Sequence, residues 1–513
     1  MTFSLTRRSA LLAALATGAC GSAGSYQDVL RVATTSLPDS LDPARGQFAS
    51  AALIYKQVHA GLTEYGGDGQ LAPGLAQSWE AAEDGLAWTF TLREGLRWSD
   101  GHPLTAEDIA WSALRLVDPA QSFAVLGDFQ NVVNARAITL GEAPADTLGV
   151  DVLDERRVRF RLDQPLGLFP LLMREFYPFP RHVIDQVGDG WIQPEHWVSA
   201  GAYTVSRASQ VDLELVRNPY FYGAADTAIS RILVQAVRDD GTRVRLFRAG
   251  ELDLADNPPG HQVDFLRETL GGEFQSFDAP ILRYLKINHA RAPLSDIDLR
   301  TRLNLAVDRD FLAREIFSDT AEPVTSSVIL GARQARSPHD NLTGASLLDD
   351  TGFVPPDRPL EIRTTTGIGE RIAIALADDW RRIGVETEIL TSYPTDLYQA
   401  VDAGEFDIAV SSFNRGLKTD PFFMLDPFAP DGFAANFNFE DAEFADLMMA
   451  ARREDDAEVR AELYRRANRR LFIRAAIIPL VHERAHWLIS DRVAGTRADV
   501  QPQLWRELAL NPG

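Results

Sequence analysis

Residues 482–486 have the spacing of a zinc protease site. The segment reads His482-Glu483-Arg484-Ala485-His486. On a helix, two imidazoles four residues apart can bind one zinc ion, and the glutamate between them can activate a metal-bound water. The segment therefore raises the hypothesis of a zinc peptidase that uses His482, Glu483 and His486, provided that residues 481–487 form a helix.

The elements that must position these side chains favour a strand instead. Pro479 interrupts any helix that continues from the amphipathic pattern over 457–474, and the β-favouring sequence WLIS follows at 487–490. On a strand, two residues four apart lie about 13 Å from each other, too far to share one zinc ion. No GxSxG elbow and no phosphate-binding loop occurs elsewhere. We therefore expect no catalytic residue, no metal site and no cofactor.

The first 25 residues have the features of an export signal. Arg7 and Arg8 precede a short apolar run at 10–19 that ends in small residues. The arginine pair is typical of either a twin-arginine signal or an ordinary basic signal region. Cys20, the single cysteine, is either a lipid acceptor or part of the discarded signal. We expect an exported chain, in the periplasm or on the outer face of the cytoplasmic membrane.

Composition narrows the class of protein. The chain has 513 residues and a formal net charge of −22, and such a surface repels nucleic acid. The length predicts roughly two to four compact units. The apolar run at 10–19 is too short to span a bilayer comfortably, and no other stretch of about 18 uninterrupted apolar residues occurs. We identify no internal repeat.

Strand and helix patterns alternate along the chain, which indicates an α/β class. We expect an edge strand near residue 29, a helix at 49–60 and a strand with Trp88, Phe90 and Leu92 on one face. Thr105 and Asp108 have the spacing of a capping box at the start of a helix. Further strands are expected at 157–162, 211–217 and 229–237, and further helices at 370–383 and 457–474.

Six blocks of sequence occur in the order seen in one known family. They are SLDP at 40–43 and the segments at 71–108, 199–223, 246–255, 282–312 and 384–412. The chain resembles the bacterial extracytoplasmic solute-binding proteins of family 5, which serve peptide ABC importers, and within them the oligopeptide receptors. This resemblance implies an α/β, two-lobed periplasmic-binding-protein-like fold, of the class II type and its large cluster, with an extra inserted domain.

The resemblance also implies domain boundaries and partners. After a signal peptide at 1–25, lobe I would comprise 26–47, 188–280 and 484–513, with an inserted domain at 48–187 and lobe II at 281–483. A monomeric receptor would capture a peptide ligand and deliver it to ABC permease subunits that work with a cytoplasmic ATPase. A receptor for another solute, such as a nickel chelate, would keep this fold and change the ligand.

The family's ligand contacts map onto three regions. The loop after the first strand supplies Thr35, Ser36 and Leu37, and the hinge strand supplies Tyr284 and Lys286. Asn257 and Tyr393 fall near further cleft positions. Each has an alternative structural role: Asn257 as a turn residue before Pro258, Tyr393 as lobe packing, and the others as ordinary loop or strand residues.

The loop SSFNRGLKTDPF at 411–422 departs from the family pattern. Phe413 takes the place of the usual tryptophan and Asn414 follows it, but Gly416 or Leu417 stands where an aspartate would pair with the ligand ammonium. A buried ammonium without a carboxylate costs several kcal/mol, so Asp420 would have to substitute. If Arg415 points into the cleft, an anionic or N-blocked ligand is favoured; otherwise Arg415 and Lys418 are solvated loop charges.

Overall fold

The computed structural model describes residues 28–46, 49–66, 71–121, 129–324, 353–414, 420–430, 439–454, 456–497 and 501–511. The export signal and Cys20 lie outside these ranges. Within them, no helix is both long enough and apolar enough to cross a membrane.

One large sheet of 11 strands runs through the molecule, in the order β15-β14-β16-β12-β17-β11-β1-β10-β9-β8, with β13 also paired to β17. Its strands are β1 (Val29–Thr34), β8 (Tyr203–Ala208), β9 (Asp212–Arg217), β10 (Arg231–Ala236), β11 (Leu254–Asp256), β12 (Phe274–Ile287), β13 (Ala321–Pro323), β14 (Leu360–Thr365), β15 (Thr387–Ser392), β16 (Ile408–Asn414) and β17 (Ile477–Ile489). The expectation that the first strand is an edge strand is wrong, because β1 pairs in parallel with both β10 and β11.

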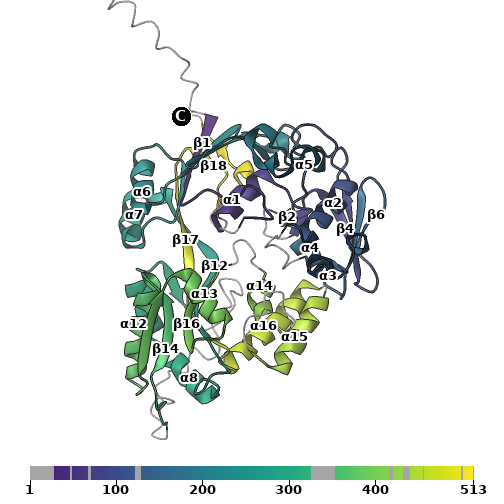
Figure 1. The fold of residues 1–513 in the computed structure, drawn as a ribbon. Coiled ribbons are helices and arrows are strands. Elements are labelled where there is room, and N and C mark those ends of the chain that lie inside the picture. The colour runs from purple at the N-terminus through teal and green to yellow at the C-terminus, as the bar shows by residue number, and fades with distance from the viewer. Residues whose placement is uncertain are drawn as a thin grey trace, which may run out of the picture.

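The helices cover this sheet and a smaller one (Figure 1). They are α1 (Ala49–Val58), α2 (Ala106–Val117), α3 (Ala135–Thr139), α4 (Phe169–Leu172), α5 (Arg181–Val187), α6 (Asp240–Arg248), α7 (Val263–Leu270), α8 (Ile297–Leu305), α9 (Arg309–Phe311), α12 (Ile368–Arg381), α13 (Pro394–Asp402), α14 (Phe422–Leu425), α15 (Ala442–Arg453) and α16 (Ala457–Ile473). The long amphipathic helices expected at 370–383 and 457–474 are thus present as α12 and α16.

Two long strands connect two lobes. β12 and β17 pair antiparallel over almost their whole length, with a first register shift between Asp278 and Ile281 and a second between Arg283 and Tyr284. Figure 1 shows them running from the part that contains β1, α6 and α7, here named lobe I, to the part that contains β14, β16 and α12, here named lobe II. The fold is therefore two-lobed, and its large sheet is continuous only through this strand pair.

A smaller sheet lies beside lobe I. It has the order β4-β5-β7-β6, formed by β4 (Ala76–Ala81), β5 (Ala87–Leu92), β7 (Arg157–Arg161) and β6 (Val150–Val152). The expected alternation in β5 is confirmed, since Trp88, Phe90 and Leu92 are its buried residues. The capping box of α2 is also confirmed, because the Thr105 N–H donates to Asp108 Oδ2 over 2.8 Å. Two-stranded pairs complete the structure: β2 (Thr63–Tyr65) with β3 (Leu71–Pro73), and β18 (Val493–Ala494) with β19 (Ala509–Leu510).

Each lobe contains the same three-stranded parallel unit. In lobe I, β1 lies between β10 and β11, and α6 connects those two neighbours; in lobe II, β14 lies between β15 and β16, and α13 connects them. The sequence AGELDLA at 249–255 leads into β11, and AGEFDIA at 403–409 leads into β16. These segments are a short internal repeat that our sequence analysis did not identify. In both, the glycine has a positive φ, +72° at Gly250 and +70° at Gly404, which favours glycine at the end of the helix.

The aspartate of each repeat is a buried centre of hydrogen bonds. In lobe I, Asp253 accepts from the backbone N–H and the guanidinium of Arg31 and from Arg492. In lobe II, Asp407 accepts from the Glu361 N–H and from Arg358. A short repeat thus ties the end of a helix to the first strand of each parallel unit.

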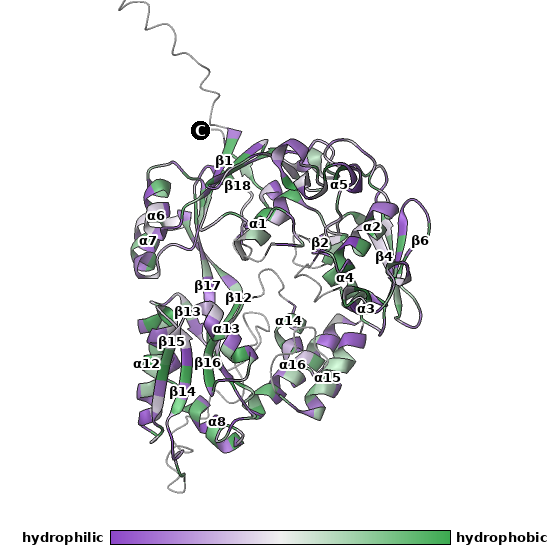
Figure 2. Cartoon of the chain, viewed as in Figure 1, coloured by the Kyte–Doolittle hydropathy of each residue, from purple (hydrophilic) through white to green (hydrophobic). Residues whose placement is uncertain are grey.

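The apolar cores follow the sheet. In lobe II, residues of β14, β16 and α12 form one cluster with the ends of β12 and β17, in which Ile362, Trp380 and Ile408 are fully buried. In lobe I, the faces of α6 and α7 cover Ala33, Ala255 and Leu488. Figure 2 shows hydrophobic colour along β16 and mixed colours on the surface helices. Burial of these apolar faces is what holds the strand ends in place.

Candidate cleft between the lobes

The HExxH segment lies on a strand, as expected. β17 extends without interruption from Ile477 to Ile489, and His482 and His486 pair with different halves of β12, opposite Leu282 and Ser276 respectively. His482 therefore lies on the lobe II side of the register shift and His486 on the lobe I side. Two imidazoles separated in this way cannot bind the same zinc ion.

The side chains of this segment also have other partners. Glu483 Oε1 accepts hydrogen bonds from the Arg283 guanidinium at 3.0 and 2.5 Å, so this carboxylate is part of an ion pair. His486 Nδ1 lies 2.8 Å from Ser276 Oγ, and its ring stacks on Phe274. Burial lowers the pKa of both histidines to about 4. Within the described ranges, no group of three or more His, Cys, Asp or Glu side chains could hold a metal ion.

We expect the protein to bind no stoichiometric zinc, because the two imidazoles lie on one extended strand, where residues four apart are about 13 Å from each other. Metal analysis after equilibration with zinc and gel filtration should give the same background for the wild-type chain and for His486→Ala. The His482→Ala variant is the matched control on the same strand. One zinc ion per chain that is lost in both variants would contradict this geometry.

Strand direction places two sets of strand ends face to face. β17 runs from lobe II to lobe I, and β11 is antiparallel to it, so β11, β1 and β10 all point toward lobe II. β12 runs from lobe I to lobe II, and β16 is antiparallel to it, so β16, β14 and β15 all point toward lobe I. Ligands of α/β proteins bind outside the carboxyl ends of parallel strands. The candidate cleft therefore lies between these ends, beside β12 and β17.

Lobe I contributes four of the residues expected from the sequence. Thr35, Ser36 and Leu37 directly follow β1 at its carboxyl end; Thr35 is exposed, and Leu37 packs partly on the core. Asn257 directly follows β11, has a φ of +47° and exposes its side chain. The Asn257 N–H donates to the His486 carbonyl over 2.9 Å, so this residue also bonds lobe I to β17.

Lobe II contributes an aromatic stack. Phe413, near the carboxyl end of β16, stacks on Tyr284 of the neighbouring β12, with ring centroids 4.5 Å apart and an interplanar angle of 11°. Both rings are buried. Tyr393 stands apart from them: it is the N-cap residue of α13, at the carboxyl end of β15, and is 79% exposed. Of the aromatic candidates, Tyr393 is thus the one whose side chain is exposed.

Lys286 lies further inside lobe II on the same face of β12 as Tyr284, and only 6% of its surface is exposed. Burial lowers the pKa of its ammonium to about 8, opposed by the charge of Asp402. The Asp420 side chain bonds to the backbone beside it, since its Oδ1 accepts the Phe422 N–H over 2.8 Å. Burial raises its pKa, against the hydrogen bond from the Phe422 N–H and the charge of Arg460. The Asn414 side chain and residues Arg415 and Leu417 lie outside what the structure describes.

Sequence reasoning missed a group of charges where the strands cross. Arg484 reaches Asp278 at 3.3 Å and Glu322 at 2.7 Å, beside the Arg283–Glu483 pair. Asp278 lies at the register shift of β12, and Glu322 lies on β13 of lobe II. The charged residues within the strand-forming segments RYLK at 283–286 and HERAH at 482–486 were the available signal. Arg484 thus connects β17 with both β12 and β13 at this crossing.

Comparison with known proteins agrees with this architecture. Residues 70–435 match the family model described as bacterial extracellular solute-binding proteins, family 5. The chain is 28% identical to the periplasmic oligopeptide-binding protein OppA of Salmonella typhimurium over 480 residues, covering 89% of this chain and 87% of that protein. It is also 28% identical to the probable deoxycholate-binding periplasmic protein YgiS of Escherichia coli over 487 residues, covering 91% and 90%.

Solved structures share the fold. The Escherichia coli murein tripeptide binding protein MppA superposes with a TM-score of 0.76 at 23% identity, covering 94% of this chain and 98% of that one. The Haemophilus influenzae OppA complex with the peptide RPPGFSPFR gives a TM-score of 0.74 at 24% identity, covering 94% and 99%. The two-lobed α/β fold is therefore confirmed.

Proposed function

Because the chain belongs to family 5 of the bacterial extracellular solute-binding proteins, we propose that its solute is a peptide, captured between the lobes and delivered to an ABC permease. The observation that carries this proposal is the opposition of two sets of parallel strand ends beside β12 and β17. Two relatives, the oligopeptide-binding protein OppA and the murein peptide-binding protein MppA, support the same class of ligand.

The cleft has the chemistry that an extended peptide needs. Buried backbone N–H and C=O groups of a ligand must be paired, and exposed strand ends and loops can pair them without reading side chains. In lobe I, the loop that follows β1 at Thr35 presents such backbone, and in lobe II the N-terminus of α13 does so beside Tyr393. Rotation of the lobes about β12 and β17 would bury the ligand, a hinge motion that a permease can recognise.

The remaining parts of the proposal concern the location of the receptor, its partners and its domain boundaries. We place the chain outside the cytoplasmic membrane, exported through the signal at 1–25, with Cys20 as the candidate lipid acceptor. It works as a monomer that docks on permease subunits, without enzymatic activity of its own. The domain division proposed is 26–47, 188–280 and 484–513 for lobe I, 48–187 for the insert and 281–483 for lobe II.

The test of the peptide proposal is the ligand that the protein carries from the cell. Native mass spectrometry of the protein purified from the exported fraction would reveal any bound mass, and release under acid followed by tandem sequencing would identify it. A bound peptide is the expected result. A bound solute without amide bonds would overturn the peptide assignment and leave the solute-binding fold intact.

The hydrogen bond that the Asp420 side chain already makes favours a second class of ligand. This residue is the nearest substitute for the absent carboxylate, yet its Oδ1 already accepts a hydrogen bond from the Phe422 N–H. A free peptide ammonium would have to compete with that N–H for the carboxylate. An N-blocked or anionic ligand avoids that competition, and Arg415 would then be its counterion.

We therefore expect N-acetylation of a peptide ligand to leave its affinity within about threefold of the free amine form. Isothermal titration calorimetry with one peptide in both forms measures the difference, and a peptide amidated at its C-terminus serves as the control for the other end. If acetylation weakens binding by about a hundredfold, an acid that pairs with the ammonium must exist in the cleft.

A further inference from the structure

A groove lies along one side of α12 in lobe II, apart from the cleft. Its volume is about 320 Å³, within the range of sites that hold small molecules. One wall is a single face of α12, since the residues that contribute to it recur with helical spacing from Arg371 to Arg382. The other wall includes Phe311 of α9 and Ile316 in the short helical turn that follows it. Figure 1 shows α12 on the side of lobe II opposite the smaller sheet.

The middle of the groove is apolar and open to solvent. Phe311 is 39% exposed and Ile374 is 57% exposed, so two large hydrophobic side chains meet water here. Ile316 and Ala375 are partly buried and continue the apolar lining down to the core of lobe II. Covering these side chains removes apolar surface from water, so a ligand with a hydrocarbon portion would be stabilised in this position.

One end of the groove carries an exposed guanidinium. Arg371 makes no ion pair with any residue that the structure describes, and its guanidinium donates to the Ile316 carbonyl. This bond holds the guanidinium beside the apolar lining and leaves further N–H donors for a ligand. Ile374 lies about one turn further along the same face of α12. An anionic group bound to Arg371 would therefore be followed directly by apolar surface.

The other end of the groove is acidic, and its side chains already have partners. Asp378 and Asp379 both pair with Arg382, at 2.5 and 3.2 Å, and Asp379 also accepts the Asp308 N–H over 2.9 Å. Two turns of helix, about 10 Å, separate Asp378 from Arg371, and salt screens exposed charges over such a distance. The polarity of the groove thus fixes the direction of an anionic ligand, with its charged end at Arg371.

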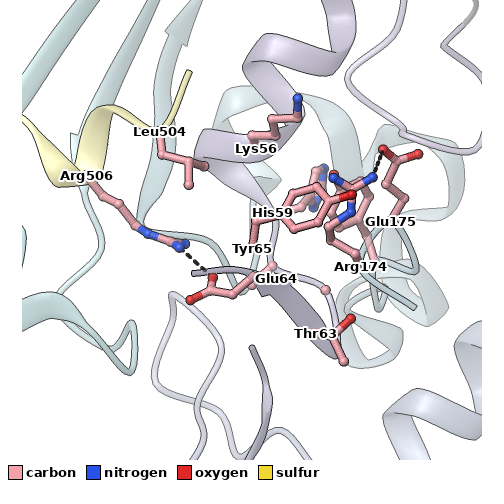
Figure 3. Close-up of a pocket in the computed structure, with 12 residues that line it drawn as sticks. Lys56, His59, Thr63, Glu64, Tyr65, Arg174, Glu175, Leu504 and Arg506 are labelled. Carbon is pink, nitrogen blue, oxygen red and sulfur yellow. Dashed lines mark hydrogen bonds and ion pairs between the residues drawn. The ribbon is translucent and has the colours of Figure 1, made fainter. Parts of the chain in front are cut away.

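A smaller cavity, of about 70 Å³, differs from this groove. It lies between the end of α1, β2 and residues 174–177. Figure 3 shows that its two acidic side chains pair with arginines, Glu64 with Arg506 and Glu175 with Arg174. A volume of this size suits a few ordered water molecules. The groove along α12 is larger and combines exposed apolar side chains with a cation at one end.

We propose that the groove along α12 binds an aliphatic carboxylate of about ten non-hydrogen atoms. The carboxylate accepts charge-assisted hydrogen bonds from the Arg371 guanidinium, and the hydrocarbon chain covers Ile374 and Phe311. The size follows from the volume, since about 30 Å³ per water-sized group gives roughly ten groups in 320 Å³. The site does not depend on the peptide proposal, because none of its lining residues belongs to the loops assigned to the cleft.

The probe for this site is octanoate, and its neutral control is octanamide, which has nearly the same shape. In protein labelled with ¹³C at the isoleucine δ-methyl groups, the signals of Ile316 and Ile374 report on the groove directly, and the variants Ile316→Val and Ile374→Val assign them. We expect octanoate to shift both signals saturably and to bind at least about threefold more tightly than octanamide, a modest factor because the ion pair is exposed. Acetate, which lacks the chain, should produce no saturable shift.

Arg371→Met keeps the aliphatic stem and removes the charge, so octanoate should bind about threefold or more weakly while octanamide binding stays the same. The matched control is Arg314→Met, which removes an exposed arginine of the neighbouring turn that does not line the groove. This control should bind octanoate as the wild type does. Thermal unfolding checks that both variants keep the fold.

Three results would each overturn the carboxylate site. They are equal binding of octanoate and octanamide, octanoate binding that Arg371→Met leaves unchanged, and the absence of saturable shifts at Ile316 and Ile374. An equal loss of octanoate binding in Arg314→Met would also contradict the site, because it would show that the general charge of the surface attracts the ligand.

Discussion

Replacing Asp253 with alanine should lower the free energy of unfolding of lobe I by about 3 to 5 kcal/mol. The carboxylate is 0% exposed and accepts bonds at 2.8 to 2.9 Å from Arg31 and Arg492. It joins β1, the start of β11 and the segment after β17. Its removal takes the carboxylate away from two partly buried guanidinium groups and from the Arg31 N–H, and the cost is that of poorly compensated buried charge.

Urea unfolding followed by tryptophan fluorescence, together with hydrogen exchange resolved by peptide, measures this effect. The matched control is Asp264→Ala in α7 of the same lobe, whose pair with Arg267 is exposed and should contribute under about 1 kcal/mol. The faster exchange should be confined to β1, β10 and β11. An Asp253 variant no less stable than the Asp264 variant would show that the buried network contributes little.

The equivalent change in lobe II, Asp407→Ala, should destabilise that lobe by about 3 kcal/mol. Asp407 is also 0% exposed and is held by Arg358 at 2.5 and 2.9 Å and by the Glu361 N–H at 3.0 Å. We place the expected loss at the lower end of the range because Arg358 is partly exposed, so water can replace the lost carboxylate.

The contribution of Asp407 should depend on pH in a defined direction. Burial opposes its ionisation, but the hydrogen bonds from Arg358 and from the Glu361 N–H outweigh burial and hold the pKa of Asp407 below its usual range. A carboxyl group with a lower pKa in the folded state stabilises the fold at neutral pH. That contribution falls as the pH drops below about 4, the pKa in the unfolded chain, and through the folded pKa.

The difference in unfolding free energy between wild type and Asp407→Ala should therefore be constant near neutral pH and shrink at acid pH. Parallel urea titrations at several pH values give this difference. The Asp378→Ala variant in α12, whose ion pairs are exposed, is the control for general acid effects. A difference that stays constant down to the most acid condition would contradict the assigned pKa direction.

Local patterns predicted much of the secondary structure because they depend on neighbouring residues. The capping box at Thr105, the alternation in β5 and the strand at 481–487 each follow from propensity or from a nearby proline, and each is present. The order of sequence blocks predicted the family and, through it, the two-lobed fold. The position of β1 was not predictable in this way, because its partners β10 and β11 lie about 200 residues further along the chain.

The same distinction between local pattern and tertiary packing applies to the candidate site. The sequence by itself determined which loops follow the strands and that residues 482–486 cannot act as a helical zinc motif. Only the tertiary structure decided that Tyr284 and Phe413 are buried against each other, that Asp420 accepts the Phe422 N–H at the start of α14, and that Asp253 and Asp407 are equivalent centres of two parallel units. These outcomes depend on which distant side chain fills the space beside a residue, and that packing arises only when strands from different parts of the chain are brought together.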